Sequence, residues 1–243
     1  MTPLYEDNHI IIVNKAPGEI VQGDKTGDTP LSDVVKAYLK EKYAKPGEVF
    51  LGVVHRLDRP VSGVVVFAKT SKALSRLNEM FRKGEVHKTY HAIIPRTASL
   101  VETQTPVLLT HFLTRNEKQN KAYAYSKEVE GSKKATLDYT IINTSDRYAL
   151  LQVNLHTGRH HQIRCQLATS LAPIKGDLKY GSSRSNPDGS ICLHAHKVSF
   201  IHPVSSKTSA SQHPTPNYPF GASLPPKTGA FTRSNVQNWA LLP

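Results

Sequence analysis

Cysteine is scarce in this sequence of 243 residues, in which only Cys165 and Cys192 occur. Two cysteines exclude a framework of several disulfides, and such low use is typical of the reducing cytoplasm. Long apolar runs are also missing, since no stretch approaches the eighteen residues that a membrane-spanning helix needs. The N-terminus lacks the basic start and apolar stretch of a secretory signal. We therefore expect a cytoplasmic protein without a membrane segment.

Acidic residues are few as well. The chain has 19 Asp and Glu against 31 Lys and Arg, which gives a formal net charge of +12. A cationic excess of this size attracts polyanions and favours a nucleic-acid partner, although a merely soluble basic protein fits the same count. An anionic lipid surface is less favoured, because no basic helix carries an aromatic-rich opposite face.

The apolar pattern predicts an α+β fold with a mixed, mostly antiparallel sheet and flanking helices and loops. Strands are expected at 10–13, 64–68, 90–94, 137–142, 149–155 and 197–201. A helix is expected over 31–39, with Thr29 as N-cap and Pro30 at its first position, and another over 71–83 that ends at Gly84. The polar segment 115–121 predicts a surface loop or hairpin.

Two regions differ in composition. Residues 1–204 carry the predicted elements and are expected to form one domain. Residues 205–243 contain no Asp or Glu and are rich in Pro, Ser and Thr, which is typical of a linker or tail. Whether this tail is ordered stays open at this point, because its aromatic residues offer anchors.

One carboxylate stands in an unusual setting. Asp58 lies between Arg56 and Arg59, ahead of a proline and an apolar strand. Neighbouring guanidinium groups lower the pKa of a carboxylate, typically by about 1–3 units, and keep it ionised as a nucleophile or base. A structural ion pair at a strand entrance gives the same pattern and, for Asp58 taken alone, is the favoured interpretation.

Two further segments carry polar groups of interest. Residues 156–164, His-Thr-Gly-Arg-His-His-Gln-Ile-Arg, predict a turn into a helix with Ile163 and Leu167 on its apolar face. Arg159 and Arg164 fit plain surface charges at this stage. Tyr90, in the strand 90–94, is by itself an ordinary half-buried strand aromatic.

A metal site is the main alternative use of these side chains. Cys192, His194 and His196 alternate, so a strand presents all three on one face. Zinc favours such ligands, and further candidates are His156, His160, His161 and Cys165. The chain contains no CxxC or HExxH spacing, however, and cysteines in strands are often plain core residues. We therefore predict no bound metal.

Taken together, the segments resemble the RluA-type family of RNA pseudouridine synthases. The stretch from His55 to Pro60, His-Arg-Leu-Asp-Arg-Pro, with Ser62-Gly63 looks like the catalytic motif of that family. The second, third and closing motifs are resembled by Lys88-x-Tyr90-x-Ala92, by Thr157-Gly158-Arg159-x-His161-Gln162-Ile163-Arg164, and by Leu193-His194-Ala195 with Phe200-x-His202-Pro203. Order and spacing match over about residues 4–204, and the closing motif gives the alternating histidines a non-metal explanation.

The sequence departs from the family pattern in two places. The basic S4-like RNA-binding domain that precedes the catalytic domain in many relatives is missing, so we expect a compact member. The tail after Val204 lacks the aliphatic and acidic positions with which relatives usually continue.

The resemblance implies an isomerase that converts a uridine of ribosomal or transfer RNA to pseudouridine after flipping it out of its stem-loop. Asp58 is then the essential carboxylate, either attacking the anomeric carbon of the sugar or abstracting a sugar proton. Arg164 is its expected ion-pair partner, with Arg159 as the alternative, and Tyr90 is expected to stack on the target base. Residues expected to bind the substrate are Arg56, Arg59, Arg159, His161, Gln162 and Leu193.

This chemistry needs no redox step or group donor, so no cofactor is expected, and a monomer is the expected state. Two other interpretations stay open: a catalytically silent RNA-binding protein on the same fold, and a zinc-dependent hydrolase acting on nucleic acid.

Overall fold

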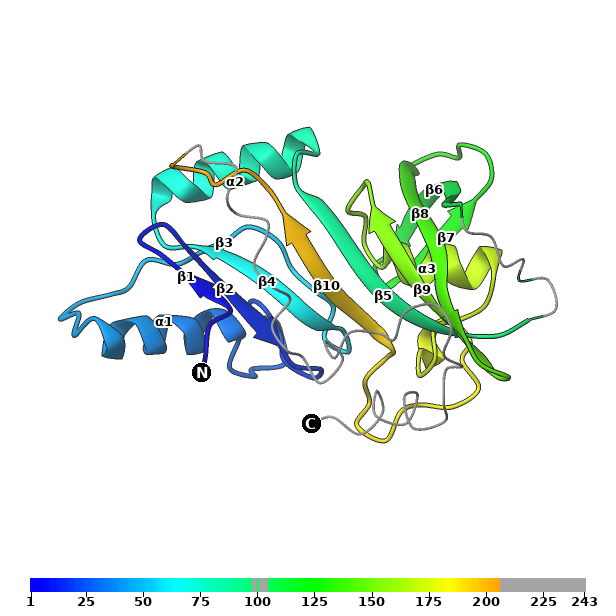
Figure 1. Ribbon diagram of the computed structural model, residues 1–243, viewed down its shortest axis with the longest axis horizontal. Helices are drawn as coiled ribbons and strands as arrows, with labels where there is room; N and C mark the ends of the chain where they lie inside the picture. Colours follow the sequence, from blue (N-terminus) through cyan, green and yellow to red (C-terminus); the bar gives the residue numbers. More distant parts are fainter. Residues whose placement is uncertain (98–99, 101–104, 206–243) are drawn as a thin grey trace. The chain divides into compact units, whose positions relative to one another are not determined.

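The computed structural model describes residues 1–97, 100 and 105–205 (Figure 1). Within them the chain forms two compact units. Among the described residues, unit 1 consists of Met1–Val86 and Lys197–Ser205, and unit 2 consists of His87–His196. The domain predicted over residues 1–204 therefore covers both units. The predicted tail, apart from Ser205, lies outside the described residues.

Unit 1 combines short antiparallel strands with two helices. Its elements are β1 (Tyr5–Glu6), β2 (Ile10–Lys15), α1 (Leu31–Lys42), β3 (Gly52–Val53), β4 (Ser62–Ala68) and α2 (Ser71–Lys83). The strand order is β1-β2-β4-β10, where β10 is Leu193–Ser199, and β3 also pairs with β4. In β2 and β4 the predicted apolar strands lie opposite each other, with Ile11 across from Phe67.

The two helices of unit 1 begin in different ways. In α2 the Thr70 hydroxyl accepts a hydrogen bond from the Ala73 amide, and Gly84 ends the helix in the left-handed conformation, as predicted. The cap predicted for α1 was wrong, because Pro30 itself occupies the N-cap position and makes no side-chain cap bond. The first amides of α1, beginning with that of Leu31 at 2.7 Å, instead donate to carbonyls of the preceding loop.

Unit 2 is dominated by longer strands. Its elements are β5 (His87–Pro95), β6 (Val107–Asn116), β7 (Lys121–Tyr125), β8 (Lys133–Thr144), β9 (Tyr148–Leu155), α3 (Gln162–Ser170) and the 3-10 turn η1 (Leu178–Tyr180). It also contains the first part of β10, up to His196. The strand order is β10-β5-β9-β8-β6-β7, in which the pairs from β5 to β7 are antiparallel. The polar segment 115–121 contains the turn of the β6–β7 hairpin, as predicted.

These elements confirm the predicted α+β class with a mostly antiparallel sheet. The sequence pattern missed β6 and β7 as strands, because their outward faces are polar or aromatic and their apolar positions are few. No helix in the described part of the chain is long and apolar enough to cross a membrane.

Candidate active site

Asp58 lies in an irregular segment of unit 1 just before β4. The preceding residue, Leu57, is buried, and the Val61 amide donates to the Asp58 carbonyl oxygen at 3.0 Å, which closes a turn. β4 begins one residue later, at Ser62. The Asp58 residue itself is partly exposed. The structure therefore places this carboxylate at the entrance of a buried strand, where the sequence predicted it.

A buried cation anchors this turn. Lys15, the last residue of β2, donates from Nζ to the carbonyl oxygens of Ala16 at 3.0 Å, Arg59 at 3.0 Å and Val61 at 2.6 Å. Burial lowers the pKa of Lys15 to about 8, while nearby carboxylates, among them that of Asp58, act in the opposite direction. Lys15 thus fixes the backbone that follows Asp58 and contributes positive charge close to it.

His55 fixes the backbone on the other side of Asp58. Its Nε2 accepts a hydrogen bond of 3.0 Å from the Val66 amide in β4, so the ring is bound to the strand that follows the turn. The same ring stacks on Phe81 of α2 with a centroid distance of 5.2 Å. The turn that carries Asp58 is therefore held from both flanks.

Arg59, one of the predicted phosphate-binding residues, contacts a neighbouring loop of unit 1. Its guanidinium donates to Asp28 at 2.6 Å and to the Thr26 hydroxyl at 2.8 Å, and it lies 3.6 Å from Asp24. Its side chain keeps 39% of its surface exposed. A phosphate bound there would compete with the carboxylates of Asp24 and Asp28 for the guanidinium. Both carboxylates are exposed, and exposed ion pairs are weak. Arg56 is exposed.

In unit 2, Arg164 forms a buried ion pair. Nε donates to Asp177 Oδ2 at 2.7 Å and Nη2 donates to Asp177 Oδ1 at 2.8 Å, with side-chain exposures of only 5% and 1%. Two parallel bonds fix the plane of the guanidinium as well as its position. The ring of Tyr180 lies 5.1 Å from the guanidinium carbon. Arg164 is therefore a rigidly oriented internal cation and not a surface charge.

Tyr180 links this ion pair to the start of α3. Its hydroxyl accepts a hydrogen bond of 2.8 Å from the Ala122 amide and lies 3.0 Å from Nδ1 of His161. Burial raises the pKa of Tyr180 well above its ordinary value, so the phenol stays neutral. His161 caps α3 with a left-handed backbone at φ 50°, a conformation that costs energy for a residue other than glycine. The Tyr180 contact helps to hold it.

Gln162 organises the turn that carries Arg159. Its Oε1 accepts hydrogen bonds from the Thr157 hydroxyl at 2.8 Å and the Arg159 amide at 2.9 Å, and its Nε2 donates to the Thr136 carbonyl at 3.0 Å. The Arg159 Nε donates to the Lys134 carbonyl at 3.1 Å. Gln162 is buried, so its amide positions the turn, and the predicted substrate contact of this residue stays a prediction.

Tyr90 and Leu193 lie in the interior of unit 2. Tyr90 is 8% exposed and faces Val153 across β5 and β9, while Leu193 is the buried first residue of β10. The histidines expected to share one face of β10 pack against β5, where His91 stacks on His196 with a centroid distance of 4.0 Å. Within residues 1–97, 100 and 105–205, no group of three or more His, Cys, Asp or Glu is arranged to hold a metal ion.

Residues 9–169 match the family described as RNA pseudouridylate synthase, a span that contains Asp58, Tyr90 and Arg164. The chain belongs to the RNA pseudouridylate synthase family.

Relatives in this family include enzymes named for two kinds of RNA. Ribosomal large subunit pseudouridine synthase D of Xylella fastidiosa is 32% identical over 214 residues, which cover 83% of this chain and 62% of that protein. tRNA pseudouridine synthase C of Vibrio cholerae is 30% identical over 217 residues, which cover 84% of this chain and 86% of that protein. The chain thus spans less than two thirds of the first relative and most of the second.

The fold of the chain is also that of known pseudouridylate synthases. The structure titled Human RNA Pseudouridylate Synthase Domain Containing 4 superimposes with a TM-score of 0.66, covering 82% of this chain and 83% of that chain at 22% identity. This likeness supports the fold alone.

Three residues of the candidate site were missed by sequence reasoning. Lys15, Asp177 and Tyr180 support the turn of Asp58 or the guanidinium of Arg164 from distant parts of the chain. Lys15 alone left a signal, as a charged residue at the end of the apolar run that begins at Ile10. Asp177 follows a glycine in a loop of ordinary composition, and nothing near it in the sequence indicates a buried carboxylate.

The buried histidines predict a stability that falls in mild acid. Burial lowers the pKa of His91 to about 3 and that of His194 to about 4. Charge repulsion from His196 lowers both pKa values further. An unfolded chain protonates both near pH 6.5 while the folded chain does not, so stability is lost as pH falls below about 6.5. We expect a loss of about 2–4 kcal/mol between pH 7 and pH 5, measured by urea unfolding.

The control is a double variant, His91→Gln with His194→Asn, in which the new amide side chains do not titrate. Its free energy of unfolding should depend much less on pH over the same range. An equally steep pH dependence in this variant would assign the effect to other groups.

Proposed function

We propose that this chain isomerises a specific uridine in a folded RNA to pseudouridine, with Asp58 as its catalytic carboxylate. The observation that carries the proposal is the family match over residues 9–169, which includes all three motifs that bear Asp58, Tyr90 and Arg164. In the reaction the N1–C1′ bond breaks, the base turns, and a C5–C1′ bond forms, while C5 loses its proton and N1 gains one. The atoms of the base balance without a cofactor.

The roles proposed for the side chains follow from their chemistry. Asp58 attacks C1′ or abstracts a sugar proton, and both steps require an ionised carboxylate. Arg164 is the proposed counter-charge, with Arg159 as the alternative, and the fork with Asp177 supports this role because it fixes the guanidinium before substrate arrives. Tyr90 is proposed to stack on the flipped base.

The proposed substrate is a stem-loop of ribosomal or transfer RNA. Five further residues are proposed to bind the RNA, either by contacting its phosphates and the target base or by positioning the segments that do so. They are Arg56, Arg59, His161, Gln162 and Leu193. The net charge of +12 supports phosphate binding, which weakens steeply with salt. We further propose that the protein acts as a monomer in the cytoplasm.

The experiment that tests this function maps pseudouridines in total RNA from a strain that lacks the gene and from its parent. One or more sites should disappear in the deletion strain and return when the intact chain is supplied, but not when the Asp58→Asn variant is supplied. Identical maps in ribosomal and transfer RNA would reject the proposed reaction and favour a catalytically silent RNA-binding protein.

A further inference from the structure

The β6–β7 hairpin of unit 2 has one buried and one open face. Leu113 and Ala122 lie on the buried face, where they pack with Ala135 and Cys165. Because successive side chains of a strand point to opposite sides, Phe112 and its neighbours at even spacing lie on the other face. That face carries the aromatic residues of the hairpin.

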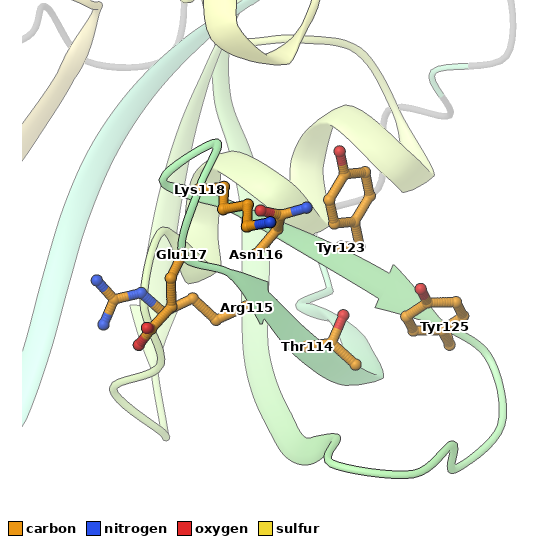
Figure 2. Close-up of a pocket in the computed structure, with 7 residues that line it drawn as sticks. All are labelled: Thr114, Arg115, Asn116, Glu117, Lys118, Tyr123 and Tyr125. Atoms are coloured by element: carbon orange, nitrogen blue, oxygen red, sulfur yellow. The ribbon is translucent and has the colours of Figure 1, made fainter.

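The register places these aromatic residues together. Phe112 lies opposite Tyr125, and Thr114 lies opposite Tyr123, so the three rings occupy adjacent positions on one face. Tyr123 and Tyr125 are 37% and 40% exposed. Figure 2 shows both tyrosines along β7, with Thr114 on the neighbouring strand. These residues line a hollow of about 620 Å³.

Cations outnumber acids beside these rings, where Arg115, Lys118 and a single acid, Glu117, line the hollow. On the side of β8, Lys134 lies opposite Phe112 and therefore on the same face. Lys121 Nζ lies 5.7 Å from the ring centre of Tyr123. Residues 112–134 include six Lys and Arg against three Asp and Glu, so the segment has a net charge of +3. We call Phe112, Lys121, Tyr123, Tyr125 and Lys134 the hairpin face.

This combination matches the chemistry of unpaired nucleotides. Aromatic rings on an open sheet surface stack with bases that are not already stacked in a helix, and neighbouring cations hold the phosphates between them. An apolar protein partner fits less well, because the rings alternate with Thr114, Asn116 and charged side chains. The net positive charge selects a polyanion.

The hairpin face adjoins the third motif within unit 2. The Lys134 carbonyl accepts the hydrogen bond from Arg159 Nε, and Gln162 bonds to the Thr136 carbonyl two residues further along β8. The motif that is proposed to act on the substrate is thus bonded to the backbone of a strand that contributes to this face.

We infer that the hairpin face binds unpaired nucleotides of the substrate RNA by stacking on Tyr123 and Tyr125. The identity of these nucleotides as neighbours of the target uridine rests on the proposed function. The four sequence motifs do not include this face, so it adds a binding surface. Through that surface, the shape of the RNA contributes to the choice of target.

The test measures binding of fluorescein-labelled rU12 to the full-length chain by anisotropy. The Tyr123→Ala/Tyr125→Ala double variant should bind at least about ten-fold more weakly, since each stacked base contributes about 1–3 kcal/mol. The Tyr123→Phe/Tyr125→Phe variant keeps both rings and should bind within about two-fold of wild type. The slope of log Kd against log salt should be unchanged in both, because phosphate contacts remain.

A blunt RNA duplex serves as the second probe, and its affinity should change little in the alanine variant because its bases are already stacked. Equal binding of rU12 by the alanine variant and the wild type overturns the inference. A lower molar mass of the alanine variant in light scattering, with unchanged rU12 binding, also overturns it and marks the face as a contact between copies.

Tritium release from RNA labelled at uridine C5 separates the two proposals. If the wild-type chain releases tritium and rU12 binding ignores the tyrosines, the inference about the hairpin face fails alone. If rU12 binding depends on the tyrosines but no RNA releases tritium, the proposed reaction fails and the face remains an RNA-binding surface.

Discussion

The Asp58→Asn variant should form no detectable pseudouridine, with a rate at least about a thousand-fold below wild type, while RNA affinity stays within about three-fold. Asparagine has nearly the same shape as aspartate, so the turn held by Lys15 and His55 persists. Its neutral amide, however, can neither attack C1′ nor accept a sugar proton at neutral pH. Tritium release from uridine-labelled RNA measures the rate, and anisotropy measures the affinity.

Two further variants make this result specific. Asp58→Ala excludes slow deamidation of asparagine back to aspartate as a source of residual activity. Asp146→Asn changes an exposed carboxylate between β8 and β9 and should retain wild-type activity. Substantial pseudouridine formation by either Asp58 variant would remove Asp58 from the catalytic role.

The Asp177→Ala variant should lose about 3–5 kcal/mol of stability, because it leaves a buried guanidinium without the carboxylate that it now contacts through two hydrogen bonds. The loss should appear as a lower midpoint of urea unfolding. Activity should fall with it, because Arg164 is no longer held in one orientation. An exposed pair is the matched control: Asp33→Ala removes a surface contact with Lys36 and a long hydrogen bond from the Ser32 hydroxyl, and it should have a far smaller effect.

A double variant separates stability from catalysis. Replacing both partners, as Arg164→Met with Asp177→Leu, removes the buried charges together and should restore most of the lost stability. Because the proposed counter-charge of Asp58 is then absent, activity should stay low. Full activity in the double variant would show that the guanidinium is dispensable, whereas wild-type stability in Asp177→Ala would show that the ion pair contributes little to the fold.

The sequence was most informative where the residues of a single helix or strand determine its structure. The apolar runs of β2 and β4 and the period of α2, with Gly84 at its end, define their own structure, and the structure confirms them. The α1 cap failed because loop carbonyls bind the first amides of that helix, and no local pattern shows such a tertiary contact. β6 and β7 were missed because only one of their faces is buried, by few and small side chains.

The candidate site shows the same division. Asp58, Tyr90 and Arg164 lie in motifs that single them out only through their resemblance to a known family, since each residue by itself fits an ordinary structural role. The groups that support them lie outside these motifs: Asp177 is thirteen residues beyond Arg164, and Lys15 is more than forty residues before Asp58. Their roles depend on long-range packing and on burial, which a local pattern does not encode.

The division of β10 between the two units has a consequence for synthesis on the ribosome. Unit 1 takes its last strand segment, Lys197–Ser199, from chain that is made more than a hundred residues after Val86. At about 5–20 residues per second, β4 therefore waits on the order of 5–25 s for that strand, with its edge open to other chains. The described part of unit 2, His87–His196, is continuous in sequence and needs no such wait. We therefore expect nascent unit 1 to be the part of the chain that depends most on chaperones.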